Sequence, residues 1–242
     1  MTMTSRPARP SLVKGSRAAR STIALKMLMA VSGALFIAFV LAHMYGNLKA
    51  FGGQDAFNGY AEHLRELGEP LLPHEGFLWL SRAGLLLALV VHVSAAVALW
   101  RRAGKARSTQ YVVKKNKHSS VSSHWMRWGG VTLLLFIVWH LLNFSFGKVN
   151  VQTGEVGSAA GDPYTLLVDS FQVWWLTAIY LLAMVALALH LHHGTWSAAQ
   201  TLGLTNNARA RRNAKALGLV IATVVAGGFS LVPVFVLAGV ID

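Results

Sequence analysis

Residues 27–47 read MLMAVSGALFIAFVLAHMYGN and contain no Asp, Glu, Lys or Arg. A helix needs about 20 mainly apolar residues to cross a bilayer, and this stretch supplies them. Similar runs recur, without the period-two alternation of barrel strands. The sequence therefore predicts an all-α integral membrane bundle after a basic leader over residues 1–22. Its five spanning helices are expected at about residues 23–47, 79–101, 125–147, 170–195 and 215–241.

The composition agrees with a membrane protein and excludes several other classes. Hydrophobic residues make up 54% of the 242 residues and charged residues only 13%, whereas an average soluble domain has about 25% charged residues. The sequence contains no cysteine. The chain itself therefore cannot supply a disulfide, a thiolate nucleophile, a Cys-ligated zinc or a Cys-ligated iron–sulfur cluster.

The charges outside the spans are sorted by sign. The N-terminal segment, the second-to-third connection and the fourth-to-fifth connection hold 18 of the 22 Lys and Arg residues and none of the nine acids. Basic loops remain on the cytoplasmic side of a membrane. We therefore expect a cytoplasmic N-terminus and a C-terminus outside. The net charge of +13 then reflects topology in a lipid bilayer, not binding to nucleic acid.

Four of the ten histidines fall inside spans, one in each of the first four: His43, His92, His140 and His190. An ionisable residue inside a span is a functional candidate by default, although a single one can also be a neutral ring bonded to a neighbouring helix. Successive spans run in opposite directions. His43 and His140 are therefore expected near the outer side, and His92 and His190 near the inner side.

Two imidazoles at each of two depths suit haem b. Haem iron takes one axial imidazole from each of two facing helices, and the flat macrocycle fits between them. Zinc and copper more often take three or four protein ligands of mixed chemistry. We therefore expect two haem b groups, with His43 and His140 as iron ligands of the outer one and His92 and His190 as iron ligands of the inner one.

Small residues precede two of these histidines by eleven positions, or about three helical turns. Ser32 precedes His43, and Gly129 precedes His140. Each would face the inner site from a helix that carries an outer ligand, leaving room for haem packing. The alternative is that both simply promote helix packing, as small residues do in membranes.

Spacing leaves the fourth ligand open, because His190, His192 and His193 all occur in the segment HLHHG. His190 and His193 lie near one helix face, and His192 points away from it. His190 is slightly favoured because it lies deeper in the apolar run. The roles of His192 and His193 do not follow from their positions.

At this point the chain resembles the cytochrome b subunit of succinate dehydrogenase, of the single-polypeptide, five-helix, di-haem kind. The resemblance covers about residues 23–240. It rests on HMYGNL at 43–48, FNGYAEHLRELGEPLLPHEGFLWLSR at 57–82 and HLHHGTWSAAQTLG at 190–203. In the family, Gly residues follow the last ligand after four and thirteen positions. Gly194 and Gly203 match them if the ligand is His190. The basic leader and loops resemble those of actinobacterial members.

The resemblance implies a complex in a bacterial plasma membrane. A flavoprotein subunit with FAD would oxidise succinate, and an iron–sulfur subunit would pass the electrons to this chain. The chain would anchor both subunits and reduce a quinone, with menaquinone expected, while the dicarboxylate chemistry stays on the partners. The alternatives are the anchor of a fumarate reductase that oxidises menaquinol, and a haem-free structural anchor.

A quinone site needs a group that exchanges protons beside an apolar slot. The resemblance places this group in the loop after the first span, where Glu66 is the nearest match and Glu62 the second. The alternative is that both are solvated loop carboxylates. Related di-haem fumarate reductases carry a transmembrane Glu two residues before the inner ligand. This chain has Ala188 at that position, so no proton route is expected there.

The quinone assignment predicts that Glu66→Gln lowers quinone turnover while the haem spectrum stays normal. The amide keeps the size of the side chain but cannot exchange a proton, and loss of such a group typically costs about 10²–10⁴-fold in rate. Turnover is measured on the assembled complex with succinate and a quinone. Unchanged turnover would contradict the assignment.

Overall fold

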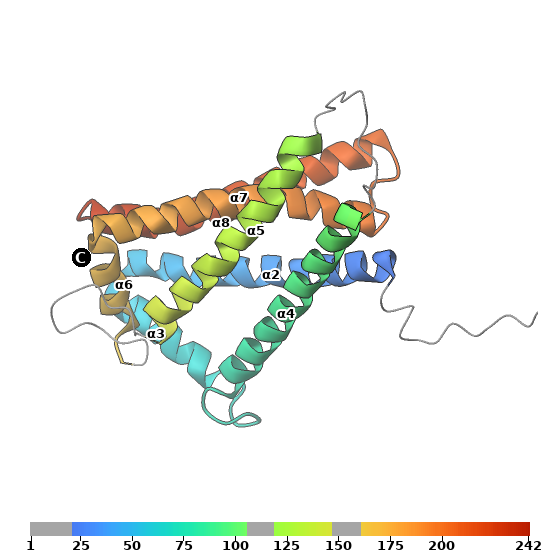
Figure 1. Ribbon diagram of the computed structural model, residues 1–242. Helices are drawn as coiled ribbons and strands as arrows, with labels where there is room; N and C mark the ends of the chain where they lie inside the picture. Colours follow the sequence, from blue (N-terminus) through green and yellow to red (C-terminus); the bar gives the residue numbers. More distant parts are fainter. Residues whose placement is uncertain (1–20, 106–118, 147–160) are drawn as a thin grey trace, which may run out of the picture.

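The computed structural model describes residues 21–105, 119–146 and 161–242, which are helical almost throughout and contain no strand (Figure 1). The expected basic leader therefore lies almost entirely outside the described residues. In chain order the helices are α2 (Thr22–Leu48), the 3-10 helix η1 (Lys49–Gly52), α3 (Gly53–Glu66), α4 (Gly76–Lys105), α5 (Ser119–His140), the π-helix η2 (Leu141–Ser145), α6 (Pro163–Gln172), α7 (Trp174–Thr201) and α8 (Ala208–Leu237).

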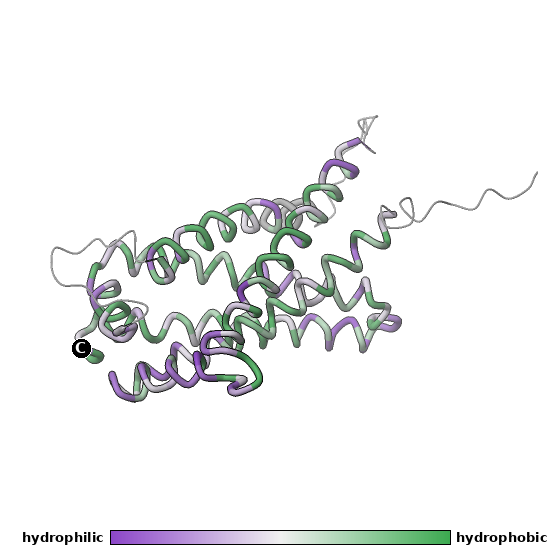
Figure 2. The backbone as a smooth tube through the Cα atoms, turned by 90° about the horizontal axis from the view of Figure 1, so that it is seen from below, coloured by the Kyte–Doolittle hydropathy of each residue, from purple (hydrophilic) through white to green (hydrophobic). Residues whose placement is uncertain are grey.

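Five of the described helical segments are long and apolar enough to cross a membrane, with mean hydropathies of 1.5 to 2.4 over their best windows. They contain α2, α4, α5, α7 and α8. Large apolar side chains such as Leu86, Leu135 and Leu182 point outward from them, each at least 63% exposed. Continuous apolar surface of this kind marks contact with a bilayer or a partner. The hydrophobic colouring along most of the long helices in Figure 2 shows the same distribution. The expected all-α, five-helix membrane bundle is confirmed.

The helix boundaries differ in places from the expected spans. The fourth expected span, 170–195, is divided at Val173, whose extended backbone (φ −80°, ψ 105°) separates α6 from α7. Asp162 caps α6, and Pro163 occupies its first turn, where the missing N–H costs no helical bond. The last helix begins at Ala208, earlier than the expected residue 215. Hydropathy does not detect the break because α6 and the start of α7 are both apolar.

The membrane helices pack unequally. α7 and α8 form the most extensive pair, α2 packs against α4, α7 and α8, and α5 packs against α7. A Cβ at Gly218 would lie 2.7 Å from the His192 carbonyl oxygen, so glycine is what lets α8 approach α7 this closely. In the described part of the chain, α4 and α5 have little contact with each other. The four histidine-bearing helices are therefore held together through α2 and α7.

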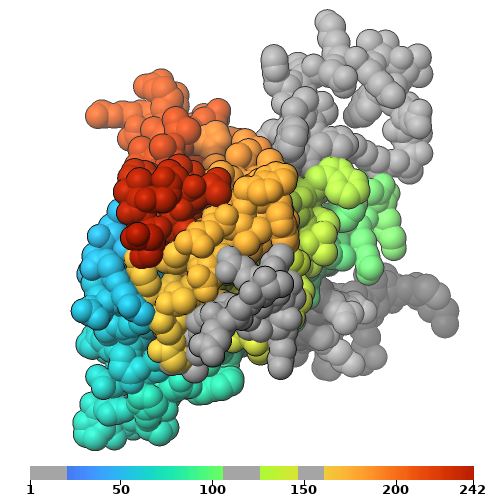
Figure 3. Space-filling view, turned by 90° about the vertical axis from the view of Figure 1, so that its left-hand side faces the viewer, coloured from blue at the N-terminus to red at the C-terminus, as the bar shows by residue number. Residues whose placement is uncertain are grey.

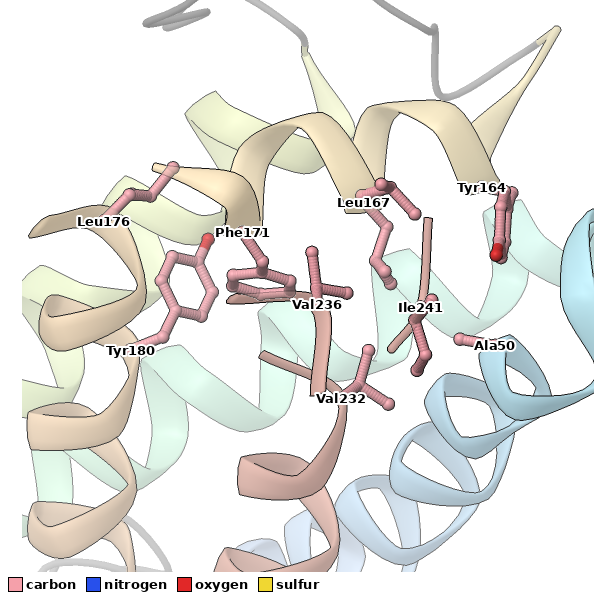
Figure 4. Packing of buried hydrophobic residues seen from close by; sticks show 10 residues of the cluster. Ala50, Tyr164, Leu167, Phe171, Leu176, Tyr180, Val232, Val236 and Ile241 are labelled. Atoms are coloured by element: carbon pink, nitrogen blue, oxygen red, sulfur yellow. The ribbon is translucent and has the colours of Figure 1, made fainter. Parts of the chain in front are cut away.

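The best-packed region lies where α6 covers the ends of α7 and α8. Phe171 of α6 and Tyr180 of α7 meet edge to face, with ring centroids 5.0 Å apart. Val232 and Val236 of α8 lie beside them (Figure 4). Figure 3 looks onto this end of the molecule, where α6, the C-terminal residues and the α2–α3 segment lie side by side. This core fixes Tyr180 firmly in the bundle.

Asp162 ties α6 to α3. Its carboxylate accepts hydrogen bonds from Gln54 Nε2 and Asn58 Nδ2, each at 2.9 Å, and from the backbone N of Thr165 at 3.1 Å. Asn58 Oδ1 in turn accepts from the backbone N of Tyr164 at 3.0 Å. These donors favour the ionised carboxylate. They lower the pKa of Asp162 to about 2, with the Thr165 side chain as the largest cause.

Asp162→Ala should destabilise the fold by about 1–2 kcal/mol, because loss of an N-cap costs roughly 1 kcal/mol and the bonds to α3 are lost as well. Asn207→Ala is the matched control, since it removes the α8 cap bond to Ala210 N (2.8 Å) and no bond to another helix. Thermal unfolding in detergent measures both. Equal losses would contradict the link between α3 and α6.

The low pKa of Asp162 also predicts that the stability of the fold depends on pH. The folded-state pKa of Asp162 lies below its ordinary value of 3.8. Its contribution is therefore present above about pH 3.8 and is lost as the pH falls toward 2. Between these two values, stability should fall more steeply with acid in the unchanged chain than in Asp162→Ala.

Candidate functional site

The four membrane histidines lie in two pairs. In the first pair, His43 of α2 lies beside His140 of α5, with ring centroids 5.8 Å apart and planes at 79°. In the second pair, His92 of α4 lies beside His190 of α7, with centroids 6.3 Å apart and planes at 55°. The structure thus brings together the two pairs that helix direction and depth predict.

Aromatic rings surround the first pair. Phe39 stacks on His43 at 5.3 Å, and Phe229 of α8 lies 5.5 Å from the same ring. Phe144 lies 5.5 Å from His140. The sequence offered no reason to expect Phe229, because α8 carries no histidine. These rings keep water away and lower the dielectric around the two imidazoles, which strengthens any electrostatic interaction there.

Tyr180 of α7 contacts His140. Its Oη lies 3.5 Å from His140 Nδ1 and donates its hydrogen to Asn143 Oδ1 at 3.1 Å. Asn143 is only 1% exposed and lies in the π-helix η2, directly after His140. A π-helical turn contains an extra residue and often occurs at functional sites. Here it rotates the backbone that carries Asn143 beside Tyr180.

The second pair is contacted by a hydroxyl and by two glycines. Ser32 Oγ lies 3.0 Å from His92 Nδ1 and donates to the Leu28 carbonyl at 2.6 Å. A Cβ at Gly33 would lie 3.6 Å from His92 Cε1, and a Cβ at Gly130 would lie 3.7 Å from His190 Cε1. The absence of side chains at these two positions lets the backbones of α2 and α5 approach the imidazoles.

Ser32 therefore lies at the second pair, where the eleven-residue spacing predicts it. The same eleven-residue spacing before His140 points to Gly129 on α5. A Cβ there would meet no described atom within 4 Å, whereas the next residue, Gly130, approaches His190. A haem-packing role for Gly129 stays a prediction.

Within the segment HLHHG, His190 is the member that lies beside His92. The His193 ring instead lies 5.7 Å from Trp196, and His192 is exposed. His190 Nδ1 is buried and has no hydrogen-bond partner among the described residues. Buried polar atoms without a partner are rare in folded proteins. The position of His190 beside His92 favours it as the fourth ligand.

An apolar groove of about 260 Å³ lies between α4 and α5. It is lined by Leu89, Val90, Val93, Ser94 and Leu134. The groove adjoins the turn of α4 that carries His92.

The donor set at each level suits an iron atom that brings further ligands of its own. Metal–imidazole bonds are about 2.0–2.1 Å long, so two imidazoles that share one metal would have ring centroids roughly 6 Å apart. The centroids of the two pairs are 5.8 Å and 6.3 Å apart. Two imidazoles per level in an apolar setting therefore fit haem b.

The quinone candidates, Glu62 and Glu66, lie on α3. Glu62 accepts a 2.6 Å bond from Arg65, and Glu66 is exposed at the end of α3. α3 leads from the end of α2 toward the start of α4 (Figure 1). Near α2 it contributes Tyr60, whose ring would lie 2.7 Å from a Cβ at Gly46. The proton-exchange roles of Glu66 and Glu62 stay predictions.

Comparisons with models of protein families, with curated proteins and with solved structures found no match for this chain. The functional assignment therefore depends on the residues of the chain and their geometry.

Gly33→Leu should displace the His92 ring, because a Cβ at this position already lies at contact distance from it. We expect loss of one of the two expected haem groups, measured by the absorbance of haem b in the purified protein. Gly33→Ala should be tolerated. Gly84→Leu is the matched control, since its Cβ position has no described atom within 4 Å. Full haem content in Gly33→Leu, or an equal loss in Gly84→Leu, would contradict this.

Proposed function

We propose that this chain is the membrane anchor and di-haem cytochrome b subunit of a succinate dehydrogenase, passing electrons from an iron–sulfur subunit to menaquinone. The single observation that carries the proposal is the presence of two imidazole pairs at two depths of a five-helix membrane bundle. The resemblance of residues 43–48, 57–82 and 190–203 to that family supports the identity of the complex.

In this proposal His43 and His140 hold one haem b, and His92 and His190 hold the other. A haem b held by two imidazoles would supply one-electron transfer. The chain itself supplies the orientation of the imidazoles and an apolar setting that excludes water. Phe39 and Phe229 do this at the first pair, and the glycine contacts of α2 and α5 allow close packing at the second.

The two levels are separated along the helix axes. Ser32 contacts the second pair and His43 belongs to the first, eleven residues further along α2. At 1.5 Å per residue this is a rise of about 16 Å, roughly half the hydrocarbon core. Charge that moves between the levels crosses much of the membrane potential, worth about 2.3 kcal/mol per charge per 100 mV. Such a bundle can couple quinone chemistry to that potential.

Basic side chains support a cytoplasmic location for the end of the bundle nearer the second pair. At this end, Arg102 donates to Thr22 Oγ1 at 3.1 Å, which joins the end of α4 to the start of α2. Arg127 of α5 lies over the Trp100 ring at 5.5 Å, and Lys215 of α8 stands over a ring of α7. Positive residues favour the cytoplasmic side. In the bacterial plasma membrane, the iron–sulfur and flavoprotein subunits would dock here.

The ligand assignment predicts that each haem depends on its own histidine pair. His43→Ala or His140→Ala should remove one haem, and His92→Ala or His190→Ala should remove the other. Reduced-minus-oxidised spectra and a redox titration of the complex count the haem components. We expect two components in the unchanged protein and one in each variant.

His193→Ala is the matched control, because His193 lies on the same helix as His190 but beside Trp196. It should retain both components. Two haems in His190→Ala together with a loss in His193→Ala would overturn the fourth ligand. A folded complex without haem would overturn the proposed function.

A further inference from the structure

We propose that Ser32 and Tyr180 are positioning residues, each of which fixes the tautomer and orientation of one histidine ligand, at one level only. Ser32 acts on His92, and Tyr180 acts on His140. The inference rests on the proposed haem ligation and adds the residues that prepare two of its four ligands.

At the second pair, the direction of the hydrogen bonds follows from the single hydrogen of a serine hydroxyl. Ser32 Oγ gives this hydrogen to the Leu28 carbonyl at 2.6 Å. With its hydrogen assigned to the Leu28 carbonyl, the nearer of two carbonyls in reach (Met29 lies at 3.3 Å), the same oxygen accepts from His92 Nδ1 at 3.0 Å. A neutral imidazole carries its hydrogen on one nitrogen only. His92 Nδ1 is then protonated, and Nε2 keeps the lone pair that a metal requires.

The same logic applies at the first pair. Tyr180 Oη donates to Asn143 Oδ1 at 3.1 Å and lies 3.5 Å from His140 Nδ1. With its one hydrogen assigned to Asn143, Oη accepts from His140 Nδ1. Tyr180 and Asn143 are 6% and 1% exposed, so no bulk water competes for these bonds. His140 therefore also keeps its free lone pair on Nε2.

The arrangement is the same on two helices. α2 carries His43 for the first pair and, eleven residues earlier, Ser32 for the second. α7 carries His190 for the second pair and, ten residues earlier, Tyr180 for the first. Eleven residues are about three turns and return to nearly the same face of α2, whereas ten residues stop about 80° short of it on α7. Each of these helices thus supplies a ligand at one level and a hydroxyl at the other.

The packing explains why the hydroxyls are needed on these two histidines. His92 and His140 lie on α4 and α5, which have little contact with each other in the described part of the chain. Mutual packing of α4 and α5 therefore cannot set the orientation of either ring. The hydroxyls reach them from α2 and α7, the two helices that pack directly against each other.

A hydrogen bond from Nδ1–H to an acceptor makes the imidazole a more basic metal ligand. A more basic ligand favours oxidised iron and lowers its reduction potential. Removal of one hydroxyl should therefore raise the midpoint potential of the haem at that level and leave the other unchanged. The potential is a property of the bound complex and can be measured without turnover.

The test compares Ser32→Ala and Tyr180→Phe in the full chain assembled with its partners. Redox titration of the haem absorbance gives both midpoint potentials, and electron paramagnetic resonance of the oxidised form reports the ligand field. We expect each variant to shift one component by about tenfold in its redox equilibrium, or 59 mV for one electron, toward the positive. The two variants should shift different components. Loss of only the haem at the affected level would also support the proposal.

Matched variants distinguish the hydrogen bond to the histidine from a simple effect of side-chain packing. Ser32→Thr keeps the hydroxyl and should keep the original potential. Ser230→Ala removes a hydroxyl that makes the same kind of helical bond, to the Ala226 carbonyl at 2.7 Å. Tyr164→Phe removes a buried tyrosine hydroxyl whose hydrogen goes to the Asp242 carbonyl. Neither control should change the midpoint potential of either haem.

Three outcomes would overturn the inference: unchanged potentials in both test variants, a shift of the same component in both, or equal shifts in the controls. In each of these cases, two haem groups in the unchanged complex would leave the proposed function intact. Absence of haem from the unchanged complex would instead refute the proposed function and this inference together.

Discussion

An imidazole in the hydrocarbon core of a bilayer has one hydrogen-bond donor and one acceptor, and no water to satisfy either. The arrangement of the membrane helices depends on this constraint. In the structure the four imidazole rings lie in two pairs, and two of the rings contact a hydroxyl group on a neighbouring helix. His190 Nδ1 keeps no partner among the described residues.

The rest of the bundle divides into a rigid part and an open part. α2, α7 and α8 pack closely, and α6 seals their ends with a core that includes Phe171 and Tyr180. α4 and α5 are attached to this part through α2 and α7, and an apolar groove lies between them. Two of the four histidines, His43 and His190, lie on the closely packed helices, and the other two, His92 and His140, lie on α4 and α5. The α3–α6 link through Asp162 holds the connecting segments at the same end.

The sequence predicts the membrane helices well because a bilayer demands length and apolarity, and both can be read along the chain. The pairing of the histidines was also predictable, since depth follows from helix direction. The break at Val173 was not, because apolar residues lie on both sides of it. The contact of Gly130, and not Gly129, with His190 depends on helix rotation, which hydropathy does not report. Tyr180 was not predictable from the same spacing, because ten residues turn it about 80° away from His190 around the helix. The contact of Asn143 with Tyr180 could not be predicted, because it depends on the π-helix that follows His140.

The central claim is that the two imidazole pairs hold two haem b groups. The most direct test is to purify the chain with the subunits that accompany it and to determine haem per polypeptide by the pyridine haemochromogen assay, together with a dithionite-reduced minus oxidised spectrum. The account predicts two haem b per chain. A folded preparation with its partners attached and no haem would contradict it, and the four histidines would then serve only to join the helices.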